Sequence, residues 1–112
     1  MSANPFIYMW AYRVLPERAD EFRRLYGPDG AWVQLFRQAP GYLGTDLYRD
    51  RDNGDRYVSI DRWESEEAFR GFRARFAKEF ERLDSDGGQL TLEETPLGEF
   101  EQAQSSRRTY EQ

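Results

Sequence analysis

The amino-acid sequence predicts a single α+β domain over residues 1–101, with a four-stranded antiparallel sheet and the element order β-α-β-β-α-β. Three patterns support this prediction. Residues 57–63 alternate with the period of two that is typical of a strand, and the period becomes helical directly after Trp63. Residues 6–14 and 42–49 alternate in the same way. Asn53-Gly54 separates two of these strands and is a strong hairpin signal.

The composition excludes several classes of function. The chain has 112 residues with 16 basic and 21 acidic side chains, and the net charge of −5 argues against nucleic-acid and anionic-membrane partners. It contains no cysteine and no histidine, so disulfides, thiolate nucleophiles and the commonest metal ligands are absent. No apolar run approaches the ~20 residues of a membrane span. We therefore expect a cytoplasmic protein without a metal or cofactor.

The first half of the chain reads as a strand, a divided helix and a second strand. Residues 6–14 are apolar on both faces, with the aromatic side chains Tyr8, Trp10 and Tyr12 on one of them. Pro16 suits the start of a helix. The sequence GPDG at 27–30 interrupts this helix, and Asp29 is expected to cap its second piece, which ends at Pro40-Gly41.

The second half begins with a hairpin, for which Asn53-Gly54 predicts a type I′ turn. Ser65 is the expected N-cap of one continuous helix that reaches Leu83 and places four phenylalanines on one stripe: Phe69, Phe72, Phe76 and Phe80. Residues 84–88 are expected to form a turn, and residues 90–100 a last strand that Pro96 leaves either bent or at an edge of the sheet. The polar tail 102–112 is either disordered or a strap across a partner subunit.

This element order is that of the ferredoxin-like fold, in which both helices cover the same face of the sheet. The other face would then be exposed in a monomer, although the first strand is apolar on both sides. We expect a homodimer in which two sheets pack face to face, and we expect Tyr8, Trp10 and Tyr12 to pack between the subunits.

Over about Phe6 to Phe100, the sequence resembles the antibiotic biosynthesis monooxygenase family of dimeric α+β barrels. Three segments carry the resemblance: PGYLGT at 40–45, YVSIDRWESEEAF at 57–69 and LGEF at 97–100. Haem-degrading relatives use an asparagine, a tryptophan and an iron-ligating histidine, at whose positions this chain has Tyr12, Trp63 and, near the third, Arg73. The absence of histidine argues against that route. Cofactor-independent relatives that form quinones keep the tryptophan but have an asparagine where this chain has Ser59.

Trp63, Asp61 and Ser59 are the candidate catalytic residues. Asp61 shares a strand face with Tyr57 and Trp63, and a carboxylate among aromatic rings is either paired with an arginine or a general base for a phenolic proton. Trp63 either fills the corner between strand and helix or lines a cavity. Candidate ligand-binding residues are Trp32, Phe36, Phe72, Tyr57 and Tyr12, each of which also suits a core or interface position.

Three functions remain open at this level. The resemblance implies a cofactor-independent monooxygenase that acts with O₂ on an aromatic or polyketide-like phenol. The alternative is a non-catalytic dimeric barrel that binds a small hydrophobic molecule or serves as an interaction domain. The third is a haem or other iron site with unfamiliar ligands. A cavity with room for two or three fused rings would favour the first, and a filled interior would leave a structural role.

Overall fold

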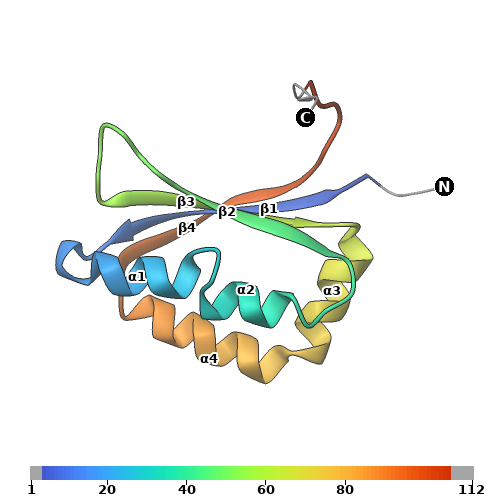
Figure 1. The fold of residues 1–112 in the computed structure, drawn as a ribbon, viewed down its shortest axis with the longest axis horizontal. Coiled ribbons are helices and arrows are strands. Elements are labelled where there is room, and N and C mark those ends of the chain that lie inside the picture. Colours follow the sequence, from blue (N-terminus) through green and yellow to red (C-terminus); the bar gives the residue numbers. More distant parts are fainter. Residues whose placement is uncertain (1–3, 107–112) are drawn as a thin grey trace, which may run out of the picture.

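The computed structural model describes residues 4–106 and confirms the predicted α+β fold (Figure 1). Its sheet has the order β2-β3-β1-β4 with every neighbouring pair antiparallel. All helices lie on one face of this sheet. Within the described residues, no helix has the length and apolar character needed to cross a bilayer. The elements are β1 (Phe6–Val14), a 3₁₀ turn η1 (Pro16–Arg18), α1 (Ala19–Tyr26), α2 (Ala31–Phe36), β2 (Tyr42–Arg49), β3 (Arg56–Trp63), α3 (Glu66–Arg75), α4 (Ala77–Gly88) and β4 (Thr91–Glu101).

The strand register decides which side chains face the helices. Trp10 is opposite Ser59 and Tyr12 is opposite Tyr57, so these residues share one side of the sheet. The Tyr12 ring packs on Phe22 of α1, with ring centroids 5.2 Å apart, which identifies this side as the helix-covered one. The prediction that Tyr8, Trp10 and Tyr12 pack between subunits is therefore wrong. The sequence could not decide the matter because both sides of β1 are apolar.

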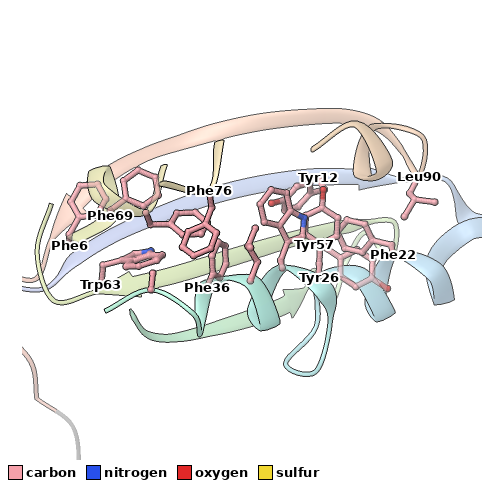
Figure 2. Packing of buried hydrophobic residues seen from close by; sticks show 14 of the residues in the cluster. Phe6, Tyr12, Phe22, Tyr26, Phe36, Tyr57, Trp63, Phe69, Phe76 and Leu90 are labelled. Atoms are coloured by element: carbon pink, nitrogen blue, oxygen red, sulfur yellow. The ribbon is translucent and has the colours of Figure 1, made fainter. Parts of the chain in front are cut away.

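The core between sheet and helices consists largely of aromatic rings (Figure 2). At one end, Trp63 packs against Phe69 and Phe72 with centroid distances of 5.8 and 5.1 Å. At the other, Phe22 stacks on Tyr26 at 4.4 Å. Such pairs contribute about 0.5–1.5 kcal/mol each beyond the area they bury. Phe72 and Phe76 are both buried, as their spacing predicted.

The hairpin between β2 and β3 forms as predicted, but its turn type differs. No residue of the loop has positive φ, so Asn53-Gly54 does not form a type I′ turn. Instead, the Asp50 carboxylate accepts hydrogen bonds from the backbone N–H groups of Asp52 and Asn53, at 2.8 and 3.1 Å. These bonds stabilise a wider loop in place of the two-residue turn.

Of the two N-caps predicted from the sequence, one is confirmed and one is wrong. Ser65 caps α3 as predicted, because its Oγ accepts a hydrogen bond of 3.1 Å from the Ala68 N–H. Asp29 does not cap α2, whose N-cap is Gly30. A Cβ at position 30 would lie 2.4 Å from the carbonyl oxygens of Arg24 and Leu25, so the tight return of the chain onto α1 requires glycine there.

The Phe-rich segment is two helices rather than one. Phe76 has φ −111° and ψ 32°, which ends α3 and separates it from α4. The break lets Phe69 and Phe72 pack on Trp63 while Phe80 packs on Trp32, at 5.0 Å between centroids.

α4 also continues through the predicted turn at 84–88. Gly87 is required inside it, since a Cβ there would lie 2.0 Å from the Tyr26 hydroxyl oxygen.

No helix covers the outer face of the sheet (Figure 1). By alternation it presents Ile7, Met9, Val58, Ile60 and Phe100. Phe100 is 44% exposed in the single chain. Beyond β4, residues 102–106 have no regular structure, and the rest of the tail lies outside the described residues.

Truncation of Phe72 to alanine should lower the free energy of unfolding by about 3–5 kcal/mol, because its buried ring contacts Phe36, Trp63 and Phe76. Urea denaturation followed by circular dichroism measures this loss. Lys78→Ala, on the exposed side of α4, serves as the control. A loss below about 1 kcal/mol for Phe72→Ala would show that α3 does not pack on the sheet as described.

Candidate active site

Strand β3 presents Tyr57, Ser59, Asp61 and Trp63 to the helices, and all four are buried. A cavity of about 280 Å³ lies over the middle of this strand, between the sheet and the helices. This volume is at the lower end of the ~300–1,000 Å³ typical of small-molecule sites. The cavity is lined by Tyr8, Trp10, Tyr12, Tyr26, Trp32, Phe36, Thr45, Ser59, Asp61, Phe69, Arg73, Phe80, Asp84 and Glu94.

Burial of the lining residues distinguishes an inner end from a mouth. Tyr12, Ser59, Asp61, Trp32 and Phe36 are buried and form the inner end. Arg73 and Asp84 are exposed, so the mouth lies toward α3 and α4. Five of the eight predicted site residues therefore meet around one cavity. An aromatic ligand that entered would contact aromatic walls and a few polar groups at the inner end.

Asp61 is a buried carboxyl group without a cationic partner among the described residues. Its side chain accepts one hydrogen bond, from the Thr45 hydroxyl at 2.8 Å, and forms no salt bridge within residues 4–106. The predicted alternative of an arginine pair is thus not realised among the described residues. Burial raises the pKa of Asp61 from 3.8 to about 7, and the Thr45 hydrogen bond and the charge of Arg62 offset part of this rise. Near neutral pH the protonated and ionised forms of Asp61 are therefore both populated.

Tyr12 and Ser59 lie side by side on neighbouring strands, with their hydroxyl oxygens 3.0 Å apart. Their hydroxyls supply two hydrogens, and only one is used in the bond between them. The other can be directed to an oxygen of a ligand. Burial keeps the pKa of Tyr12 well above its usual value of 10.0, so the phenol remains a neutral donor.

The remaining three predicted site residues lie outside the cavity wall. Trp63 is fully buried behind Phe36 and Phe69, at 5.6 and 5.8 Å between ring centroids, and its indole N–H has no acceptor among the described residues. Phe72 belongs to the same packed group, with its ring centroid 5.1 Å from that of Trp63. The Tyr57 hydroxyl accepts a hydrogen bond from Arg23 at 2.7 Å. A direct contact of Trp63 with a ligand stays a prediction, and it requires Phe36 or Phe69 to move.

Several lining residues were not predicted from the sequence, and Arg73 is the most notable. Arg73 has its guanidinium 4.0 Å from the Phe80 ring centroid and contributes to the mouth. Its position four residues after Phe69 was the available signal, because residues at that spacing share a helix face. Thr45 and Tyr26 were also missed. Their roles depend on strand register and helix packing.

The mouth carries charges of both signs. Asp84 and Glu94 lie near Tyr26, whose pKa is raised mainly by burial and further by these two carboxylates. Arg73 instead acts on Tyr8, where its charge opposes the rise in the pKa that burial causes. Within residues 4–106, no group of three or more His, Cys, Asp or Glu residues is arranged to hold a metal ion.

The sequence profile described as "Antibiotic biosynthesis monooxygenase" matches residues 5–82, which include β1 to β3, α3 and most of the cavity lining. The chain belongs to this family. No curated protein has significant sequence similarity to the chain. The family assignment therefore comes from the profile and the fold.

Solved structures support the same assignment. A mutant of SnoaB, a cofactor-independent oxygenase from Streptomyces nogalater, is 25% identical with a TM-score of 0.75, over 92% of this chain and 97% of that chain. A second SnoaB structure is also 25% identical, with a TM-score of 0.69 over 96% and 97% of the two chains. The protein PA3566 from Pseudomonas aeruginosa is 18% identical with a TM-score of 0.71 over 93% and 99%, which shows the shared fold.

Replacement of Asp61 by asparagine should stabilise the protein above neutral pH. Between about pH 4 and 7 the native carboxyl holds a proton that the unfolded chain releases, so stability falls as the pH rises through this window. Above pH 7 Asp61 is ionised in both states, and the full loss in the free energy of unfolding is on the order of 4 kcal/mol. Urea denaturation at pH 4 and pH 8 should show a gain for Asp61→Asn at pH 8 and little change at pH 4. Asp52→Asn, in the exposed hairpin loop, should behave like the parent at both values. If the free energy of unfolding depended on pH equally in the parent and in Asp61→Asn, a buried Asp61 carboxyl with a raised pKa would be contradicted.

Proposed function

We propose that this protein is a cofactor-independent monooxygenase that oxidises a fused-ring phenolic molecule with O₂. The observation that carries the proposal is Asp61, a buried carboxyl with no cationic partner within residues 4–106, whose pKa lies near 7 and which faces an aromatic cavity. A general base is most effective when its pKa is close to the working pH. The two SnoaB structures at 25% identity support the reaction class.

In the proposed reaction, Asp61 removes a proton from a phenolic or enolic hydroxyl of the substrate. The resulting anion is electron-rich, and the substrate supplies all four electrons that reduce O₂, so no separate reductant is required. A ring carbon bonds to O₂ to give a hydroperoxide, which loses water to leave a carbonyl. The balance is R₂CH₂ + O₂ → R₂C=O + H₂O, in which the substrate carbon is oxidised and O₂ is reduced. The proton taken by Asp61 is returned when the O–O bond breaks.

The Tyr12–Ser59 pair takes the place of an amide donor in this scheme. Deprotonation places negative charge on a substrate oxygen, and a preorganised donor in a water-poor site stabilises such charge. The spare hydroxyl hydrogen of the pair can provide that hydrogen bond. Trp32 and Phe36 would pack on the rings of the substrate, and Trp63 would support the wall that Phe36 and Phe69 form.

The functional unit that we propose is a homodimer through the outer sheet face. Ile7, Met9, Val58 and Ile60 form an apolar surface in the middle of that face, and Tyr48 at its edge is 53% exposed. Apolar patches of this kind are typical of interfaces. The cavity lies on the opposite side of the sheet, so dimerisation would leave its mouth free.

Turnover is tested by oxygen uptake and absorbance with a panel of anthrones, hydroquinones and flavonols. With a substrate that reacts, Asp61→Asn should lower kcat/KM at least ~10-fold, about 1.4 kcal/mol of transition-state stabilisation. The parent rate should rise with pH through about 7, as the carboxylate form of Asp61 becomes populated. Asp52→Asn is the matched control, expected to retain the parent rate.

The same assay separates the alternative functions. Binding of these compounds without oxygen uptake would favour a non-catalytic protein that binds a small hydrophobic molecule. Full activity in Asp61→Asn would refute the assignment of the base. An absorption band of bound haem in the purified protein would point to an iron site instead.

Replacement of Ile60 by aspartate should disrupt the dimer, because it places a charge in the centre of the outer face. Sedimentation equilibrium should show a dimer for the parent and a monomer or aggregated protein for Ile60→Asp. The expected interface is on the order of 2,000 Å². Ala74→Asp, on the exposed side of α3, adds the same charge away from this face and should remain dimeric. A monomeric parent at micromolar concentration would exclude the proposed assembly.

A further inference from the structure

A chain of hydroxyl groups leads from Asp61 to the β2 edge of the sheet. The Thr45 hydroxyl donates to Asp61 Oδ1 at 2.8 Å, and the Tyr42 hydroxyl lies 2.6 Å from Thr45 Oγ1. Thr45 is paired with Asp61 across the β2–β3 register, and Tyr42 begins β2, the edge strand of the sheet. Asp61 is 8% exposed, whereas Tyr42 is partly exposed. The chain thus connects a buried carboxyl with the edge of the protein.

The hydrogens in this chain have a defined order. Thr45 has a single hydroxyl hydrogen, which it donates to Asp61, so the hydrogen between Tyr42 and Thr45 comes from Tyr42. All donors therefore point toward the carboxylate. When Asp61 is protonated, both hydroxyls can rotate. Asp61 then donates to Thr45, and Thr45 donates to Tyr42. The Tyr42 ring is fixed by packing on Phe36 and Trp63, at 5.3 and 5.4 Å between centroids, which holds its hydroxyl in place.

We propose that Thr45 and Tyr42 form a proton path that exchanges the Asp61 proton with solvent while a ligand fills the cavity. An empty cavity admits water to Asp61, but an aromatic ligand would exclude it. Thr45 is then the one hydrogen-bond partner of this carboxyl within residues 4–106. This proposal rests on the proposed function in one respect, which is that Asp61 is the general base of the proposed reaction.

The transfer balances without any change in oxidation state. The Asp61 proton moves to Thr45 Oγ1, the Thr45 hydrogen moves to Tyr42 Oη, and the Tyr42 hydrogen moves to water. One proton reaches solvent and Asp61 becomes a carboxylate. Because the overall oxidation releases no net proton, the path sets the protonation state of Asp61 before each turnover and does not remove a product.

Other groups influence Asp61 but do not replace this path. Arg62 follows it in β3, lowers its pKa through charge, and is paired with Asp46 at 2.5 Å. Tyr8, Tyr12 and Tyr26 interact with its charge from β1 and α1. None of these four is hydrogen-bonded to the Asp61 carboxyl in the described part of the chain. Tyr42 and Thr45 are therefore positioning and proton-transfer residues of a base that touches the ligand.

The test measures proton exchange directly, with a ligand that is not turned over. The protein is saturated with 1,8-dihydroxyanthraquinone, which is already a quinone, and subjected to a rapid pH jump. The Asp61 carboxyl band is followed by stopped-flow infrared spectroscopy and assigned by subtraction of Asp61→Asn. Tyr42→Phe and Thr45→Val should slow the exchange at least ~10-fold, and Thr45→Ser should restore it. Controls from the outer sheet face are Tyr48→Phe and Thr95→Val, which should match the parent.

The ligand-free proteins provide a second comparison. All variants should then exchange at the same rate, since water enters through the open cavity. Equal rates for Tyr42→Phe, Thr45→Val and parent in the ligand complex would overturn the path. Failure of the quinone to bind would also overturn it, because nothing would then close the cavity. Slowed exchange in a protein that oxidises no substrate would retain the path and refute the monooxygenase.

Discussion

The packing of Trp63 against Phe36, Phe69 and Phe72 fixes the corner at which β3 passes into α3. A strand has a two-residue period, so a side chain fixed at its end also fixes the direction of every second residue before it. Asp61 and Ser59 consequently point toward the helices. A register slip of one residue would place the carboxyl on the outer face, away from the Thr45 hydroxyl that donates to it. The site thus depends on a contact that lies outside it.

The buried Asp61 carboxyl lowers the stability of the fold, although it supplies the reactive group of the candidate site. An apolar residue at position 61 would pack among aromatic rings without the cost of desolvation. The chain instead keeps an acid with a single hydrogen-bond partner within residues 4–106, which makes folding less favourable as the pH rises. Residues that lower stability without an evident structural role are typical of functional sites.

The sequence was most informative where a period was clear. The alternation from Tyr57 to Trp63 correctly placed Ser59, Asp61 and Trp63 on one face, and the Phe spacing correctly predicted that Phe72 is buried. It could not tell which face of β1 meets the helices, because both are apolar. The break at Phe76 was also missed, since no proline or glycine marks it and only the packing of two aromatic clusters requires it. Thr45 became visible as a site residue only through its register with Asp61.

The residues that hold the chemistry lie on the sheet, and those that limit access to it lie on the two helices that flank the break at Phe76. The sheet carries Asp61, Ser59 and Tyr12, whereas Arg73 and Asp84 come from the two helices on either side of Phe76. A change in the angle at this joint would widen or narrow the entrance without disturbing the strands. Related proteins could in this way come to accept ligands of different size while they keep the same reactive groups. Selection could therefore change the helices at the cavity mouth and the reactive groups on the sheet independently.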